Sequence, residues 1–234
     1  MHIRSWVRDH LLSVRGNTDT YLEPFVGGGG IAEVMVPHFQ NNILSDAHED
    51  LILMWQSLRD GWIPPTTITK EQYDELRDAE PSALRGFVGF GASWGGKWFG
   101  GYVDQPWDKF YGRVTQPYME TAARAVLRTS AVFQAHHTTI AHKSYEFWSP
   151  RPNNLVYCDI PYKGTTGYKG VGAFDQGAFW DWATQWSLTG ATIVVSESEA
   201  PDNWEVLAER KRKNYTKVST DKGNRREALF MLRR

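Results

Sequence analysis

The pattern of apolar and polar positions changes period several times along the first sixty residues. Ile3–Val14 places apolar side chains three and four positions apart, which predicts an amphipathic helix. Thr20–Phe25 is rich in β-forming residues and runs into four glycines, after which Ile31–Phe39 can be helical. Asn42–Ser45 predicts a short strand, and Glu49–Arg59 predicts a helix with an inward apolar stripe. Two strand–helix units in succession predict a parallel sheet.

A different pattern follows in residues 64–116, which we interpret as an insertion into the sheet domain. Thr69–Gln72 has the sequence of a capping box and predicts the start of a charged helix. Gly86–Gly101 contains seven glycines among aromatic residues, which predicts a loop. We therefore expect a sheet domain built from residues 1–63 and 117–234, with residues 64–116 inserted between its two parts.

The periodic pattern then resumes and alternates between the two kinds of element. The expected helices are Tyr118–Phe133, Gln176–Ser187 and Asn203–Arg210, and the expected strands are Thr138–Ala141, Leu155–Cys158, Ala191–Val195, Tyr215–Val218 and Ala228–Leu232.

Composition narrows the class of protein. Of the 234 residues 41% are hydrophobic and 23% charged, which suits a globular chain with a real core. Cys158 is the only cysteine, so an intramolecular disulfide and a cysteine-cluster metal site are excluded. Neither a signal peptide nor a long apolar run is present, so we expect a cytoplasmic protein that is neither secreted nor membrane-spanning.

The charge is nearly balanced overall but uneven along the chain. A net charge of −1 gives no general attraction to nucleic acid. From Pro201 to Arg234, however, ten Lys or Arg stand against five Asp or Glu. The cluster Arg210–Lys213, together with Arg225 and Arg226, can therefore contact phosphate or form a solvated face.

Two features of the first half point to a nucleoside ligand. Glu23–Gly30 (EPFVGGGG) follows a strand and opens a helix, so its amides can approach a ligand without intervening side chains. Dinucleotide sites use a similar device, and a tight turn without any ligand is the plain alternative. Asp46 follows about twenty residues later at a strand end, where a carboxylate can accept ribose hydroxyls. Its alternative role is that of a helix N-cap.

The most specific signal is Asp159–Tyr162 (DIPY), which follows an apolar strand and precedes a glycine-containing loop. It is similar to the Asp-Pro-Pro-Tyr motif of amino-methyltransferases. With Glu23–Gly30 and Ser45-Asp46 before it, and with the Gly86–Gly101 stretch, the chain resembles the Dam-like, D12 class adenine-specific DNA N6-methyltransferases, many of them carried by phages.

The resemblance implies a fold, a reaction and its partners. The fold is the class I S-adenosylmethionine-dependent methyltransferase fold, a Rossmann-like, mostly parallel seven-stranded sheet with an inserted recognition region of helices and loops. The reaction transfers a methyl group from S-adenosylmethionine to N6 of a flipped-out adenine in double-stranded DNA, in a bacterial or phage-infected cell, as in restriction–modification. Neither a metal nor a membrane is needed, because the sulfonium cofactor already carries an activated methyl group.

The resemblance also implies roles for individual residues. Asp159 and the Ile160 carbonyl would accept the two N6 hydrogens, Pro161 would stiffen the turn, and Tyr162 would stack on the base. The residues implied for the cofactor are Glu23, Phe25, Gly27, Gly29, Asp46 and Asp159. Those implied for DNA are Lys97, Trp98, Arg225 and Arg226, although the glycine–aromatic stretch can equally be a structural loop.

Two departures from the family pattern leave other functions open. The chain starts inside the first helix, without the family's preceding glycine and basic motif, and Ile160 replaces the first proline of the usual motif. The alternatives are a catalytically inactive DNA-binding relative, and an amino-methyltransferase that acts on RNA or another substrate. An oxidoreductase would use the glycine loop but would leave DIPY without a purpose.

Overall fold

One seven-stranded sheet organises the chain, which we describe from a computed structural model of residues 3–103, 118–149, 151–161, 174–212 and 225–233. The strand order is β3-β2-β1-β4-β5-β7-β6. β1 to β5 are parallel to one another, whereas β7 runs antiparallel to both of its neighbours, β5 and β6. A mostly parallel seven-stranded sheet is what we expected from the sequence. The strands are β1 Thr20–Glu23, β2 Asn41–Asp46, β3 Thr138–His142, β4 Asn154–Asp159, β5 Thr192–Glu197, β6 Trp204–Arg212 and β7 Arg225–Leu232.

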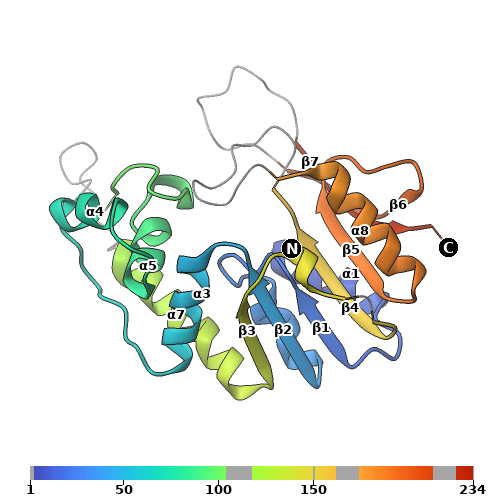
Figure 1. Cartoon of the computed structure of the whole chain (residues 1–234), viewed down its shortest axis with the longest axis horizontal. Helices are drawn as coiled ribbons and strands as arrows, with labels where there is room; N and C mark the ends of the chain where they lie inside the picture. The colour runs from blue at the N-terminus through green and yellow to red at the C-terminus, as the bar shows by residue number, and fades with distance from the viewer. Residues whose placement is uncertain (1–2, 104–117, 150, 162–173, 213–224, 234) are drawn as a thin grey trace.

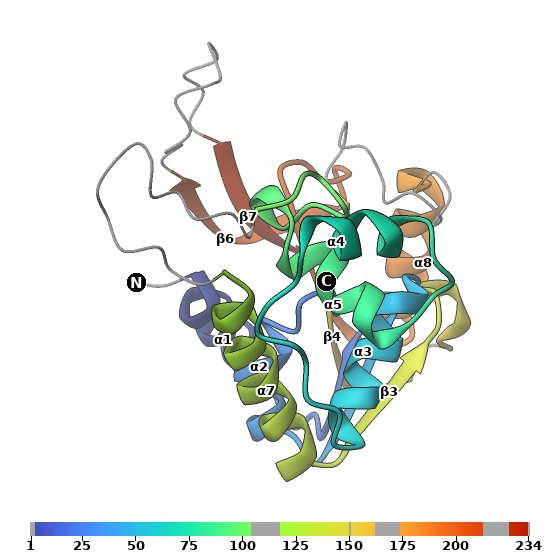
Figure 2. The same cartoon turned by 90° about the vertical axis from the view of Figure 1, so that its left-hand side faces the viewer.

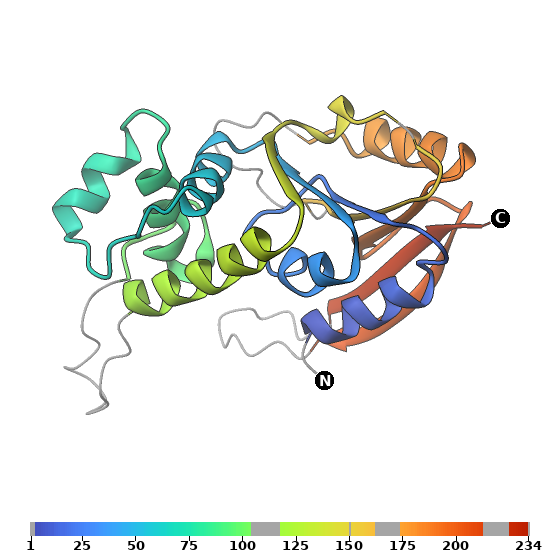
Figure 3. The ribbon, with the colours of Figure 1, turned by 90° about the horizontal axis from the view of Figure 1, so that it is seen from below.

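Helices cover both faces of this sheet (Figures 1 and 3). α1 Ile3–Ser13, the short α2 Ala32–Met35, α3 Glu49–Arg59 and α7 Tyr118–Ala135 contribute to a core that includes Tyr21, Leu44, Leu155 and Val194. α8 Gln176–Leu188 packs on the opposite face, over Val156 and Val195. The inward stripe predicted for α3 is confirmed, because Leu51, Ile52, Trp55 and Leu58 are all buried. None of the helices in the described ranges is long and apolar enough to span a bilayer.

Glu33 on α2 joins three helices of the first face. Its carboxylate accepts from Arg4 Nη1 on α1 at 2.8 Å, and from Arg128 Nε and Thr129 Oγ1 on α7 at 2.8 and 3.0 Å. These bonds hold the short helix that follows the glycine turn. The helix predicted over Ile31–Phe39 is only four residues long, and a 3-10 turn, Val36–His38, replaces its second half. Pro37 explains the break, since it offers no backbone N–H to continue the α-helix.

α5 Ala83–Gly91 packs against α3, and α4 Lys70–Arg77 packs against α5. They form the left-hand end of the molecule in Figure 1, which faces the viewer in Figure 2. Both belong to the expected insertion, and the capping box of Thr69 and Gln72 is present at the start of α4. The loop predicted over Gly86–Gly101 is wrong in its first part, because Gly86–Gly91 is helical. Phe87 and Val88 belong to the same core as β1 and β4, so the insertion shares the core of the sheet.

The glycines of α5 serve helix packing. A Cβ atom at Gly86 would lie 2.2 Å from the backbone oxygen of Asp50 on α3, and one at Gly89 would lie 2.3 Å from the Trp98 ring. Glycine therefore lets α5 approach α3 at backbone distance. An ion pair of 2.7 Å between Arg85 and the buried Asp50 reinforces this contact. The low helix propensity of glycine is outweighed here by tertiary contacts.

A second prediction fails near the C-terminus, where Asn203–Arg210 is not a helix. Trp204–Arg212 is strand β6, paired antiparallel with β7 and carrying an irregularity between Val206 and Ala208. The segment consists largely of good helix formers, but pairing with the Ala228–Leu232 strand, which was correctly expected, decides its conformation. The predicted strand Tyr215–Val218 lies outside the described residues.

Gly86→Ala should destabilise the protein by about 1–3 kcal/mol, because the new methyl group must displace the Asp50 backbone. Urea unfolding would measure this as a lower transition midpoint. Gly177→Ala is the matched control, since a Cβ atom there meets only Asp175 Oδ1, at 3.4 Å, in helix α8. This control should be neutral or stabilising by up to about 1 kcal/mol. Equal midpoints for the two variants would contradict the packing role of Gly86.

Candidate active site

The candidate site lies at the carboxyl edge of the parallel strands. β1 stands between β2 and β4, so the three strand ends Glu23, Asp46 and Asp159 come to neighbouring positions. Each of the three acids follows a buried residue of one core, Tyr21, Leu44 or Tyr157, by two positions. Alternate residues of a strand point to the same face, so the three acids share one face of the sheet. The sheet thus brings together three of the acidic residues that the sequence singled out.

The glycine turn after β1 has the backbone shape that only glycine adopts easily. Gly27 and Gly29 have φ angles of +46° and +68°. A Cβ atom at Gly29 would lie 2.9 Å from the Trp55 ring, whereas at Gly27 and Gly28 it would meet nothing within 4 Å. Gly29 is therefore needed for packing, and the backbone at Gly27 and Gly28 borders open space. Trp55 Nε1 donates to the Gly27 carbonyl at 2.9 Å and fixes the turn.

Asp46 connects this turn to β2 and α3. Its Oδ2 accepts from the Gly27 amide and its Oδ1 from the His48 amide, each at 2.9 Å. The N-cap of α3 is His48, so the alternative of Asp46 as the cap residue is wrong. Burial raises the pKa of Asp46, while its backbone hydrogen bonds lower it and reduce the shift. The carboxylate is held rigidly at the position where a ribose ligand was expected.

Glu23 is the most buried of the three acids, with 2% of its surface exposed. Tyr21 on the same strand donates its hydroxyl to Glu23 Oε2 at 2.6 Å. Burial raises the pKa of Glu23 well above its usual value; the Tyr21 hydrogen bond opposes this, and the nearby Asp159 and Asp46 add to it. Tyr21 was not singled out in the sequence, although a tyrosine two positions before an acid on a strand shares its face.

The DIPY motif begins at the last residue of β4. Asp159 is exposed, whereas the Ile160 side chain is buried with Leu22 and Phe179 under α8. The Pro161 carbonyl accepts from Gln176 Nε2 at 2.8 Å, which ties the motif to the start of α8. The isoleucine that replaces the family's proline thus has a packing role of its own. Tyr162 lies outside the described residues.

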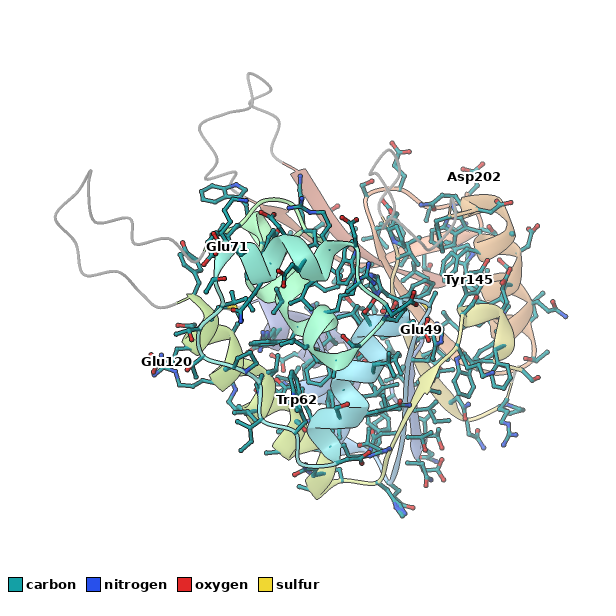
Figure 4. All side chains as sticks on the ribbon, turned by 60° about the vertical axis from the view of Figure 1, so that its left-hand side comes forward. Glu49, Trp62, Glu71, Glu120, Tyr145 and Asp202 are labelled. Carbon is teal, nitrogen blue, oxygen red and sulfur yellow. The ribbon has the colours of Figure 1, made fainter. Side chains whose placement is uncertain are left out.

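Phe25 points to the other side of the turn. Its ring lies 5.6 Å from Tyr145 and 5.8 Å from both Phe174 and Phe179, in an aromatic cluster on the α8 face. Figure 4 labels Tyr145 beside this helix. Because these aromatic rings pack around Phe25, a cofactor could contact the Phe25 ring only at the edge of the cluster.

The residues expected to contact DNA divide into two groups. Lys97 is exposed, but Trp98 is half-buried, with its ring centroid 4.3 Å from His48 and 4.9 Å from Phe90. The structure therefore gives Trp98 a packing role against the start of α3. Arg225 and Arg226 begin β7, and because β7 runs antiparallel to β5 they lie at the carboxyl edge, beyond Ala228 and its partner Glu197.

Two features near this edge had not been singled out from the sequence. Glu197 ends β5 with 2% exposure, and its Oε1 accepts from the Ser198 amide and hydroxyl at 2.7 Å. An acid that ends an apolar strand, as Glu23 and Asp159 do, is the signal that could have found it. The second feature is His48, which connects the strand ends to the inserted region: its amide donates to Asp46, and its ring packs on Trp98.

Within the described residues, the candidate residues belong neither to a cluster of metal ligands nor to the hollow at the opposite edge of the sheet. Within the described ranges no three His, Cys, Asp or Glu side chains gather closely enough to hold an ion. A hollow of about 940 Å³ opens at the opposite edge, where Thr20, Asn41 and Thr138 begin their strands. None of the candidate residues lines that hollow.

Glu23→Gln should change how stability depends on pH. Because the pKa of Glu23 is raised in the folded state, its carboxyl stays protonated at pH values above its usual pKa of 4.5. Its contribution to the free energy of unfolding is therefore present at low pH and is lost as the pH rises through the raised pKa. The difference in unfolding free energy, wild type minus variant, should therefore fall with increasing pH in urea titrations.

Glu33→Gln is the control with the opposite sign. Burial raises the pKa of Glu33, but hydrogen bonds from Arg128 and Thr129 outweigh it and leave the pKa lowered. Its contribution is present above the usual value and is lost as pH falls through the lowered pKa, so its difference should grow with pH. A pH-independent difference for Glu23→Gln would contradict the buried, protonated carboxyl.

Two solved structures are similar to this chain at low sequence identity. Among solved structures, "Putative methyltransferase yhhF from Escherichia coli" is 12% identical, with a TM-score of 0.43 over 99% of this chain and 86% of that one. "Putative methylase HI0767 from Haemophilus influenzae" is 10% identical, with a TM-score of 0.41 over 99% of each. No curated protein sequence matches.

A family model gives the more specific result. The model described as D12 class N6 adenine-specific DNA methyltransferase matches residues 2–84. This range contains the glycine turn with Glu23 and Asp46 and ends within α5, before the DIPY motif. Residues 2–84 of this chain therefore match the family of D12 class N6 adenine-specific DNA methyltransferases, and the resemblance found in the sequence is confirmed over this range.

Proposed function

We propose that this protein transfers a methyl group from S-adenosylmethionine to N6 of an adenine that is flipped out of double-stranded DNA. The observation that carries the proposal is the alignment of Asp46, Glu23 and Asp159 at adjacent strand ends, beside the glycine turn. The family match covers the first two of these acids, and Asp159 brings the DIPY motif to the same edge.

The residues at this edge fit the cofactor. S-adenosylmethionine carries a sulfonium and an ammonium group, and carboxylates favour cationic ligands. The open space at Gly27 and Gly28 would admit a ligand next to backbone, and Asp46, bonded to the Gly27 amide, would accept ribose hydroxyls. Glu23 and Asp159 would face the charged part, and Phe25 and Gly29 would support the turn. When bound, the cofactor supplies an activated methyl group.

The chain's own contribution to the reaction is to prepare the amino group. The lone pair of adenine N6 is conjugated with the ring, and hydrogen-bond acceptors for both N6 hydrogens would localise it. Asp159 is exposed at the end of β4 and would accept one hydrogen, and the Ile160 carbonyl would accept the other. Burial of the Ile160 side chain and the bond from Gln176 to Pro161 would keep these acceptors in place. Stacking by Tyr162 stays a prediction.

DNA is the substrate that best fits the remaining residues. A flipped base must enter from a duplex, whose phosphates require basic groups close to the edge. Arg225 and Arg226 start β7 at this edge, and Lys97 is exposed on the inserted region. The chain's small net charge makes such local groups the source of DNA affinity. A role in restriction–modification and a phage-infected or bacterial cytoplasm stay expectations.

Asp159→Ala should lower kcat for N6-methyladenine formation by about 10²- to 10³-fold, because one acceptor for the amino group is lost. The assay incubates duplex DNA with labelled S-adenosylmethionine and identifies the methylated nucleoside after digestion. Asp202→Ala is the control, since Asp202 is an exposed acid in the loop before β6, labelled in Figure 4. Full activity in Asp159→Ala would refute its role.

The wild-type result separates the remaining functions. Cofactor binding without a methylated product on DNA would favour an RNA or other amine as the substrate. An absence of cofactor binding, with DNA binding retained, would favour an inactive DNA-binding relative.

A further inference from the structure

We propose that the turn carrying Trp94 and Lys97 is the part of the inserted region that grips DNA, with the Trp94 indole stacked on a base and the Lys97 ammonium against a phosphate. The inference rests on the proposed function, which names DNA as the partner. It replaces Trp98 by Trp94 as the aromatic residue that contacts DNA.

Trp94 is the exposed tryptophan of this stretch. It is 58% exposed, whereas Trp98 is half-buried against His48 and Phe90. Arg85 Cζ lies 5.1 Å from the centroid of the Trp98 ring. The absence of a Cβ atom at Gly89 leaves space for the Trp98 ring. Within the described part of the chain, no ring or cation contact involves Trp94. Trp98 is thus committed to packing, and Trp94 is available for a ligand.

The backbone around Trp94 is held in place by neighbouring helices. The Trp94 amide donates to the Gly101 carbonyl at 2.9 Å, and the Phe99 amide donates to the Gly89 carbonyl on α5 at 2.8 Å. These bonds close the turn and attach it to α5. A contact surface that is ordered before binding loses less conformational entropy when the ligand arrives.

A buried tyrosine adds a second attachment, to α4. Tyr73 has no exposed surface, and its hydroxyl bonds Ser93 Oγ at 2.8 Å and accepts from the Gly101 amide at 3.2 Å. Ser93 Oγ in turn donates to the Gly89 carbonyl at 2.7 Å. Tyr73 therefore holds both Ser93, which precedes Trp94, and Gly101, whose carbonyl accepts from the Trp94 amide.

Lys97 lies at the other end of the same turn as Trp94. Its amide donates to the Trp94 carbonyl at 3.3 Å, and both side chains are exposed. Gly95 and Gly96 between them have φ angles of +65° and +66° and carry no side chains that could shield the indole. An aromatic face with a cation on the same turn is the combination that binds stacked bases together with their phosphates.

The turn is connected to the candidate active site. Trp98 packs on His48, whose amide is bound by Asp46 at the end of β2. DNA held at the Trp94 turn would therefore be held on an element that contacts the carboxyl edge of the sheet. Base flipping exposes the faces of neighbouring bases, and stacking on such a face compensates for part of the lost base stacking.

A single exposed aromatic side chain is common on protein surfaces, and Phe147 provides the comparison. It is 57% exposed, and Lys143 Nζ lies 4.4 Å from its ring centroid, but it belongs to the 3-10 turn Tyr145–Phe147 before β4. Phe147 thus matches Trp94 in exposure and in having a neighbouring lysine. Unlike Trp94, however, Phe147 lies outside the inserted region.

The test measures the Kd for a labelled duplex with a mismatched central adenine, by fluorescence anisotropy. Trp94→Ala should weaken binding by about 5- to 100-fold, Trp94→Phe should lose clearly less, and Phe147→Ala should bind like the wild type. Lys97→Gln should reduce the slope of log Kd against log salt concentration by about one, whereas Trp94→Ala should leave this slope unchanged. Circular dichroism checks that each variant is folded.

Three outcomes would overturn the inference. Wild-type affinity in Trp94→Ala, or an equal loss in Trp94→Phe and Trp94→Ala, would exclude stacking at this turn while leaving methylation of DNA intact. An equal loss in Phe147→Ala would show a general effect of surface aromatics. A wild-type protein that binds no DNA and yields no methylated adenine would overturn the proposed function as well.

Discussion

The parallel pairing of β1 between β2 and β4 is the constraint on which the site depends. It places Glu23, Asp46 and Asp159 at one edge, although 23 and 113 residues separate them along the chain. Like charges at neighbouring strand ends are unfavourable unless one group is neutral or a cation is bound. Burial is the main cause of the raised pKa of Glu23, and the nearby Asp159 and Asp46 add to it, whereas the hydrogen bond from Tyr21 opposes the shift. A proton on Glu23 relieves that crowding.

The first strand–helix unit beside these strand ends is short and is held by contacts from other elements. The glycine turn must pass close to the Trp55 ring, and Asp46 uses both oxygens to fix backbone amides on the two sides of the edge. Because α2 has only one helical turn, its orientation depends on the Glu33 bonds to α1 and α7. The candidate cofactor site is therefore shaped by side chains from several elements.

The inserted region is part of the same folding unit as the sheet. Gly86 brings α5 to the backbone of α3, and the Arg85–Asp50 pair and the Trp98–His48 contact lie along the same junction. α3 begins at Glu49, three residues after Asp46, so the junction reaches the candidate active site within a few residues. Cofactor binding and DNA recognition would thus share α3 as a common support.

The sequence by itself determined the local features of this protein. The helical period of Glu49–Arg59, the capping box at Thr69, the apolar strand before Asp159 and the glycine turn are each set by neighbours in the chain, and each is present in the structure. The order of these motifs was also sufficient for the family resemblance. The roles of Lys97, Arg225 and Arg226 remain predictions.

Tertiary structure decided the rest, because packing against distant residues outweighs local propensity. Pairing with β7 makes Trp204–Arg212 a strand, and close contact with α3 keeps the glycine-rich start of Gly86–Gly101 helical. The same effect chose between two tryptophans four residues apart: the Gly89 gap and His48 bury Trp98, while Trp94 stays exposed. The spacing of the two tryptophans along the chain does not show which one is buried, because burial depends on which part of α5 and α3 lies against each ring.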